Sequence, residues 1–165
     1  MSRKNSTLKK IRVNFASLED IRLFARIFFL ITLLPVILRL MSLPGLLKML
    51  TPRDLRVCHD PDPETKAKIV KFTEYLLGRN FWMYKNTCLK RSLVLYHMLR
   101  RSKIDVQLCL GVRPKAKPSA EMAQMVLEGH AWLLYKENIF LERDMRAART
   151  YLVTYSFPDM MGQQI

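Results

Sequence analysis

Apolar residues recur every three or four positions through the first hundred residues, the spacing of helices that bury one face. This spacing predicts four helices, which cover 18–33, 36–50, a segment from Asp62 to Gly78, and a segment that opens at Asn86 or Thr87 and runs through Arg101. The last of these places Leu89, Leu93, Tyr96 and Leu99 on its buried side. We therefore expect the N-terminal part of the chain to be helical.

Prolines and capping residues mark the ends of these helices. Pro35, or the pair Pro44-Gly45, should separate the first two, because proline lacks the N–H that an interior helical hydrogen bond needs. Asp62 can cap the third helix, and Pro63 suits its first turn.

Beyond Ser102 the apolar residues alternate with polar ones, which is typical of half-buried strands. This pattern predicts strands over 104–112, 129–135 and 139–144, with a tight turn at 136–138. Short connections favour an antiparallel meander. The predicted fold class is α+β: a small antiparallel sheet, a helix bearing Cys88 packed on it, and a helical N-terminal arm.

The chain divides into four segments. These are a basic, flexible N-terminus over 1–18, an apolar helical arm over 19–50, a proline-rich connection over 51–64 and a core over 65–165. The longest uncharged run of the arm, 27–38, is shorter than the roughly 20 residues that span a bilayer. We expect the arm to pack on the domain, with a membrane-surface contact through 20–50, or a true span, as the alternatives.

The net charge indicates the chemistry of the partners, and the cysteine content indicates the cellular compartment. With 28 Lys and Arg against 14 Asp and Glu, the net charge is +14, which favours acidic partners. No nucleic-acid-binding module is recognisable, so no nucleic acid partner is expected. The three cysteines, Cys58, Cys88 and Cys109, do not make a disulfide framework, and a cytoplasmic location is the simpler setting.

Cys88 is the candidate nucleophile. It lies in the first turn of its predicted helix, where free N–H groups and the positive end of the helix dipole stabilise a thiolate. The same N–H groups could hold the oxyanion that forms when a carbonyl is attacked.

Of the three histidines, His130 is the candidate base. His97 follows Cys88 by nine residues on one helix, which puts it about 180° round and roughly 13 Å along. His59 lies in the triplet Cys58-His59-Asp60, which lacks the paired spacing of a metal site. His130 lies on a predicted strand, where it can face a helix N-terminus. No cofactor and no metal are expected.

Two carboxylates compete to orient the imidazole. If Tyr135 pairs with Ile139 across the hairpin, His130 falls opposite Asp144, and Glu142 lies two residues away on the same face. The spacing alone leaves both acids open.

Several short stretches together resemble one protein family. They are Asn86-Thr87-Cys88-Leu89-Lys90-Arg91-Ser92-Leu93, Leu99-Arg100-Arg101, Leu110-Gly111-Val112 and Gly129-His130-Ala131-Trp132. In these stretches the chain resembles the transglutaminase-like maturation proteases of lasso-peptide biosynthesis, over 20–145. The stand-alone peptidase of that pathway begins with a leucine-rich helical arm and lacks the separate leader-recognition domain, and this chain is similar in both respects.

The resemblance implies a transglutaminase-like, papain-like cysteine protease core that removes the leader from a ribosomally made precursor. The implied partners are the precursor leader peptide, a separate leader-recognition protein and the macrolactam-forming cyclase. The family's nucleophile falls on Cys88, its base on His130 and its aspartate on Glu142, with Asp144 as the alternative acid. Family members commonly have Glu four positions after the histidine, where this chain has Leu134.

Two alternatives accompany this prediction. One is a non-catalytic binding or scaffold protein with a degenerate transglutaminase-like fold. The other is an acyl transferase that uses the same triad.

Overall fold

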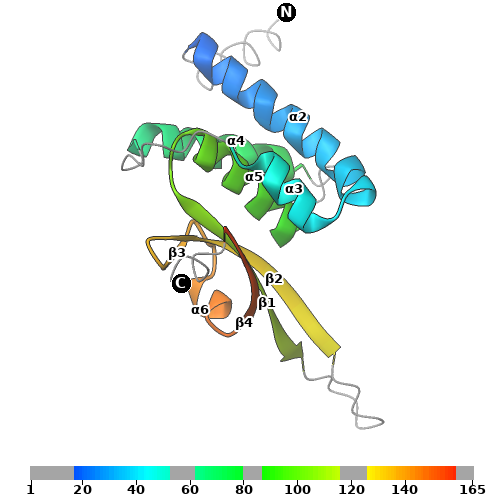
Figure 1. Ribbon diagram of the computed structural model, residues 1–165. Helices are drawn as coiled ribbons and strands as arrows, with labels where there is room; N and C mark the ends of the chain where they lie inside the picture. Colours follow the sequence, from blue (N-terminus) through cyan, green and yellow to red (C-terminus); the bar gives the residue numbers. More distant parts are fainter. Residues whose placement is uncertain (1–16, 53–61, 80–86, 116–125, 159–165) are drawn as a thin grey trace, which may run out of the picture.

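The computed structural model describes residues 17–52, 62–79, 87–115 and 126–158 (Figure 1). Its helices are α2 (Leu18–Leu40), α3 (Leu43–Leu50), α4 (Pro63–Leu77), α5 (Cys88–Arg101) and the short α6 (Met145–Ala148). Its strands are β1 (Val106–Lys115), β2 (Val126–Tyr135), β3 (Asn138–Phe140) and β4 (Leu152–Phe157). The predicted α+β class is confirmed.

Helix α5 lies at the centre of the fold. It packs on β1 and β2 on one side and against α4 and α2 on the other, so that α2 forms the layer farthest from the sheet (Figure 1). The core therefore sits around α5, and its largest fully buried side chains include Tyr96, Leu93, Leu95, Leu99, Ile27, Ile31, Leu34, Leu46, Ile69 and Ile104.

The four strands form one antiparallel sheet in the order β3-β2-β1-β4. The predicted meander corresponds to β1, β2 and β3. Strand β4 was not predicted; it pairs with the free side of β1, with a register shift between Leu110 and Gly111. This pairing makes β1 a central strand, and it brings the segment just before β4 beside the middle of β1.

Helix α2 runs through Pro35, where the sequence predicted a break. A proline removes only one interior hydrogen bond, and Ile31 and Leu34, just before it, are buried against the domain and hold the helix together. The chain instead turns between Met41 and Ser42, and Pro44 lies in the first turn of α3. By length and composition alone, α2 is long and apolar enough to cross a membrane.

Helix α4 begins as predicted. The side chain of Asp62 accepts hydrogen bonds from the backbone N–H groups of Glu64 and Thr65, at 3.3 and 3.0 Å, and Pro63 occupies the first turn. The Thr65 hydroxyl also donates to Asp62, at 2.7 Å, and this bond, followed by the backbone bond from Thr65, lowers the pKa of Asp62 below its ordinary value.

The β2–β3 hairpin is one residue tighter than predicted. Lys136 and Glu137 both have positive φ, 48° and 63°, which is the conformation of a two-residue type I′ turn. Tyr135 therefore pairs with Asn138 rather than with Ile139. Strand β3 also ends at Phe140, so the predicted pairing of His130 with a strand residue at Asp144 does not form.

Two basic residues near the end of α5, the half-buried His97 and the buried Arg100, make hydrogen bonds within the protein. His97 donates from Nδ1 to the Leu50 carbonyl at 2.6 Å, and burial lowers the pKa of its imidazole. Arg100 is 4% exposed; it pairs with Asp105 and donates to the Val106 carbonyl at 3.1 Å. These contacts attach α5 to α3 and to the start of β1.

Some sequence predictions lie outside the described residues. They concern the basic N-terminus, the Cys58-His59-Asp60 triplet, the alternative cap Asn86 and most of the loop between β1 and β2.

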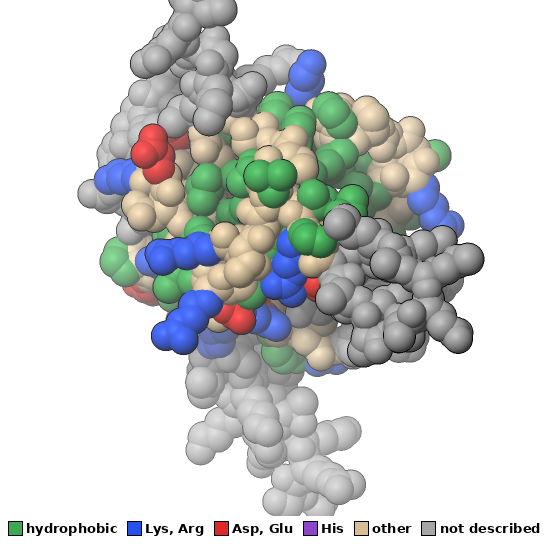
Figure 2. Space-filling view, turned by 90° about the horizontal axis from the view of Figure 1, so that it is seen from below, with side chains coloured by type: hydrophobic (Ala, Val, Ile, Leu, Met, Phe, Trp, Pro, Cys, Tyr) green, Lys and Arg blue, Asp and Glu red, His purple; other side chains and the backbone are tan. Residues whose placement is uncertain are grey.

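The face of the molecule seen from below has an apolar centre with Lys and Arg side chains around it (Figure 2).

Candidate active site

Cys88 is the first residue of α5. Thr87 caps the helix: its side chain accepts the Lys90 N–H at 3.3 Å, and its carbonyl accepts the Arg91 N–H at 3.0 Å. The first N–H groups of a helix have no partner within the helix, and the helix dipole adds positive potential there. The half-buried Cys88 thiol therefore lies beside donors that could hold a developing negative charge.

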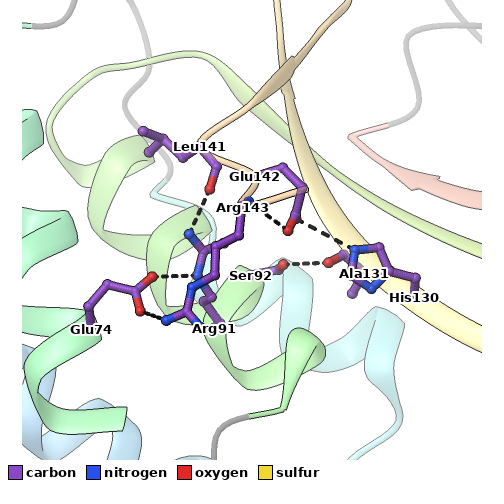
Figure 3. Close-up of polar contacts among 8 residues, drawn as sticks. All are labelled: Glu74, Arg91, Ser92, His130, Ala131, Leu141, Glu142 and Arg143. Carbon is purple, nitrogen blue, oxygen red and sulfur yellow. Dashed lines mark hydrogen bonds and ion pairs between the residues drawn. The ribbon is translucent and has the colours of Figure 1, made fainter. Parts of the chain in front are cut away.

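A buried hydrogen bond ties this end of α5 to β2. Ser92 is one turn after Cys88 and lies on the same side of the helix. Its hydroxyl donates to the Ala131 carbonyl at 2.9 Å (Figure 3). Because Ala131 adjoins His130, this bond brings the Cys88 end of the helix to the part of β2 that carries the histidine.

His130 and Glu142 face each other, with 3.6 Å between Nε2 and Oε2 (Figure 3). Their side chains are 21% and 10% exposed, so this contact is largely shielded from water. The other Glu142 oxygen accepts the Arg143 backbone N–H at 2.9 Å. Asp144, the alternative acid, caps α6 instead and accepts the Ala147 N–H at 2.9 Å. With Nε2 toward the carboxylate, Nδ1 is the nitrogen left to exchange a proton with a thiol.

The imidazole packs in a group of three rings, with Trp132 and Tyr151 themselves 6.3 Å apart between centroids. Its centroid is 5.0 Å from that of Tyr151 and 5.9 Å from that of Trp132, and it is stacked on both. Burial raises the pKa of Tyr151, and charge on Cys88 adds a smaller contribution in the same direction. The Cys88 thiol is thus within electrostatic range of a ring that stacks on His130.

Gly111 makes this packing possible. It pairs with His130 across the β1–β2 ladder. A Cβ at Gly111 would lie 2.7 Å from both the Trp132 ring and the Leu152 carbonyl oxygen. Any other residue would push away the aromatic ring beside His130 or the backbone of β4.

A network of ion pairs around the buried Arg91 lies beside the candidate acid. Arg91 donates from Nε to Glu74 at 2.7 Å and from a terminal nitrogen to the Leu141 carbonyl at 2.6 Å (Figure 3). Arg143 also pairs with Glu74. Burial lowers the pKa of Arg91, and the charge on Glu142 opposes that effect.

Sequence reasoning missed Arg91, Ser92 and Tyr151. Arg91 and Ser92 were part of the quoted cysteine stretch, but nothing in the period of the helix distinguishes an arginine that binds a turn from one that faces water. Tyr151 precedes the unpredicted strand β4, so its approach to His130 depends on a strand pairing that the local pattern did not reveal.

The remaining titratable residues of the described segments offer neither a metal centre nor a second active thiol. No group of three or more His, Cys, Asp or Glu side chains within the described segments could hold a metal ion. Cys109 is 1% exposed, and burial raises the pKa of its thiol to about 11, so it is an unreactive core residue.

Comparison with known proteins identifies one family. The family model described as the transglutaminase-like superfamily matches residues 32–154, from the middle of α2 into β4. The matched range contains Cys88, His130 and Glu142. No curated protein and no solved structure matches this chain.

Proposed function

Because the chain belongs to the transglutaminase-like superfamily, which includes cysteine proteases and acyltransferases, we propose that it is a cysteine endopeptidase. Its proposed substrate is the ribosomally made precursor of a lasso peptide, from which it removes the leader. The observation that carries the proposal is the contact of His130 with Glu142, together with the hydrogen bond that joins the strand bearing His130 to the Cys88 helix one turn from the thiol.

In the proposed reaction, Cys88 Sγ attacks the scissile carbonyl carbon and its proton passes to His130 Nδ1. The carbonyl oxygen becomes an oxyanion that the free N–H groups at the start of α5 stabilise. Collapse of this intermediate breaks the C–N bond, and the imidazolium gives its proton to the leaving amine. Water, deprotonated by His130, then hydrolyses the thioester and regenerates the thiol.

Glu142 has an orienting part in this scheme. A carboxylate at Nε2 selects the tautomer that leaves Nδ1 free to accept a proton, and it stabilises the imidazolium that forms. A glutamate can do this in place of the family's aspartate because it carries the same carboxylate, which here lies 3.6 Å from the imidazole.

The proposed partners are the precursor leader peptide, a separate leader-recognition protein and the macrolactam-forming cyclase. The net charge of +14 favours an acidic leader or partner surface. Binding that depends on such attraction weakens as salt is added.

The test is to incubate the protein with its precursor peptide and the leader-recognition partner and to detect a leader fragment by mass. We expect Cys88→Ala to slow cleavage by roughly 10⁴-fold or more while the protein folds normally. The control for loss of a thiol is Cys109→Ala. Cys109 is buried in a cluster with Trp132 and Tyr151, the rings beside His130, so this variant should lose stability while the folded protein still cleaves the precursor.

Undiminished cleavage by Cys88→Ala would rule the proposal out. A product that carries a new amide instead of a new carboxylate would point to an acyl transferase with the same residues. Absence of any product from the wild type with its partners would favour a non-catalytic binding protein.

A further inference from the structure

The turn that carries Glu142 is attached to the helices rather than to the sheet. Strand β3 ends at Phe140, so its pairing with β2 stops two residues before Glu142. Leu141, which lies between them, has φ of 55°, in the left-handed region that disfavours side chains other than Gly, Asn and Asp. A leucine persists in this conformation only where its surroundings hold it.

Arg91 supplies that hold. Its terminal nitrogen donates to the Leu141 carbonyl at 2.6 Å, while Nε donates to Glu74 on α4 at 2.7 Å. Two different nitrogens of the rigid guanidinium fork make these bonds, and the single nitrogen of a lysine side chain cannot occupy both places. The Arg91 side chain is 10% exposed, so both bonds form away from bulk water.

The other neighbour of Glu142 is attached to the same group. Arg143 pairs with the second oxygen of Glu74, and its backbone N–H donates to Glu142 (Figure 3). The residues on both sides of Glu142 are therefore anchored to the Arg91–Glu74 pair. This arrangement restrains the backbone of Glu142 and directs its carboxylate toward His130.

We propose that Arg91 is a positioning residue, which holds the Leu141–Arg143 turn so that Glu142 meets His130. Glu74 acts with it by fixing the guanidinium from α4. The inference rests on the proposed roles of His130 and Glu142, and it adds that the acid is held in place by the cysteine helix itself. Arg91 follows Cys88 by three residues, so one helix bears the nucleophile and positions the acid.

The experiment follows alkylation of Cys88 by iodoacetamide at neutral pH, read from the mass of the peptide that contains Cys88. In this reaction the thiolate displaces iodide, so the rate depends on the fraction of thiolate, which an oriented imidazole promotes. No peptide substrate is needed. The variants are Arg91→Met, Arg91→Lys, Glu142→Gln and the double variant Arg91→Met with Glu142→Gln, each checked for folding by circular dichroism.

We expect Arg91→Met and Glu142→Gln each to slow alkylation by about tenfold, at the low end of what outer partners of a functional histidine contribute. The double variant should be no slower than Glu142→Gln, because Arg91 acts only through that carboxylate. Arg91→Lys should remain slow, since lysine cannot make both bonds. If Arg91→Met fails to fold, Glu74→Gln replaces it in the same double-variant comparison.

Arg100→Met is the matched control. Arg100 is also buried on α5 and also pairs with an acid, but its partners are Asp105 and the Val106 carbonyl, away from the Glu142 turn. This variant should alkylate at the wild-type rate. An unchanged rate in Arg91→Met, or effects of Arg91→Met and Glu142→Gln that multiply in the double variant, would overturn the inference.

The outcome is separable from that of the proposed function. If no precursor is cleaved but the double variant alkylates no more slowly than Glu142→Gln, the peptidase proposal fails and the positioning role of Arg91 stands. If the precursor is cleaved and the effects of the two substitutions multiply in the double variant, the peptidase proposal stands and the positioning role fails.

Discussion

Helix α2 is the more apolar of the two long helices α2 and α5, yet α5 is the more buried. Helix α2 is nearly all apolar after Arg26, yet of its 23 residues only Asp20, Ile27, Ile31 and Leu34 are buried. Helix α5 has two basic residues near each end, yet nine of its 14 residues are buried, including Arg91 and Arg100. Hydropathy alone would predict that α2 is more buried than α5.

Position in the layered fold explains the difference. Helix α5 lies between the sheet and helices α4 and α2, so most of its surface meets protein (Figure 1). Among the described segments, only helices α3, α4 and α5 pack against α2, and large apolar side chains of α2 such as Phe29 and Leu33 are exposed. The buried arginines of α5 are tolerated because each has an acidic partner and a backbone carbonyl.

The comparison teaches that the number of layers around a helix, rather than its composition, decides which of its residues contribute to stability.

Equal truncations should cost the same in both helices wherever burial is equal. Leu93 on α5 and Ile31 on α2 are 0% and 1% exposed. We expect Leu93→Ala and Ile31→Ala each to lower the free energy of unfolding by about 2–5 kcal/mol, because each leaves a cavity in the core. Urea denaturation followed by circular dichroism measures this.

The control for that pair is Leu33→Ala, in the same apolar stretch as Ile31 but 52% exposed. It should change the free energy of unfolding by no more than about 0.5 kcal/mol. A loss as large as that of Ile31→Ala would mean that the outer side of α2 is covered in solution and would break the comparison.

The N-terminal cap should contribute more to stability in α2, the less buried helix, than in α5. Ser17 and Asp20 form a reciprocal capping box at the start of α2, with bonds of 2.9 and 3.2 Å, whereas Thr87 makes one bond of 3.3 Å at α5. We expect Ser17→Ala to cost about 1 kcal/mol and Thr87→Ala about half that, because α5 depends more on tertiary packing than on its cap. Amide hydrogen exchange in the two first turns measures both.

A larger loss in Thr87→Ala than in Ser17→Ala would contradict this order. Ser17→Ala should also leave the alkylation rate of Cys88 unchanged, since Ser17 caps α2, the layer farthest from the sheet that bears His130.

His97 adds a small dependence on pH. Burial lowers its folded-state pKa below the ordinary value of 6.5, so the unfolded chain binds a proton more readily than the folded protein does. Stability contributed by neutral His97 is therefore present above pH 6.5 and is lost as the pH falls below it. After allowance for solvent screening of a half-buried ring, we expect about 0.5 kcal/mol.

The measurement is the difference between the wild type and His97→Gln in free energy of unfolding at pH 7.5 and pH 5.5. The wild type should lose more than the variant on acidification. If both lose the same amount, the imidazole is not the group responsible.

Much of the fold was predictable from local patterns. The start of α4, the capping of α5 by Thr87, the buried line of Leu93, Tyr96 and Leu99 and the antiparallel class of the sheet all follow from periodicity and capping. Strand β4 and the continuity of α2 through Pro35 did not, because both depend on contacts with distant segments.

The candidate site divides in the same way. Cys88 at a helix start and His130 on a strand were recognisable because each depends on one element. The choice between Glu142 and Asp144 stayed open because the sequence predicted a turn one residue too long and a strand that continued too far. The structure brings Glu142 to His130 and uses Asp144 as a cap.

Near neighbours in the chain were enough to indicate the helix that begins at Cys88 and the strand that bears His130, because each depends on periodicity and capping within one element. Only the tertiary structure decided the burial of Arg91 and the left-handed Leu141. It alone stacks Tyr151 on His130, a contact that joins residues twenty-one positions apart. Such contacts follow from layer order and strand pairing, whose free energy is shared over the whole core, so no local window of sequence contains them.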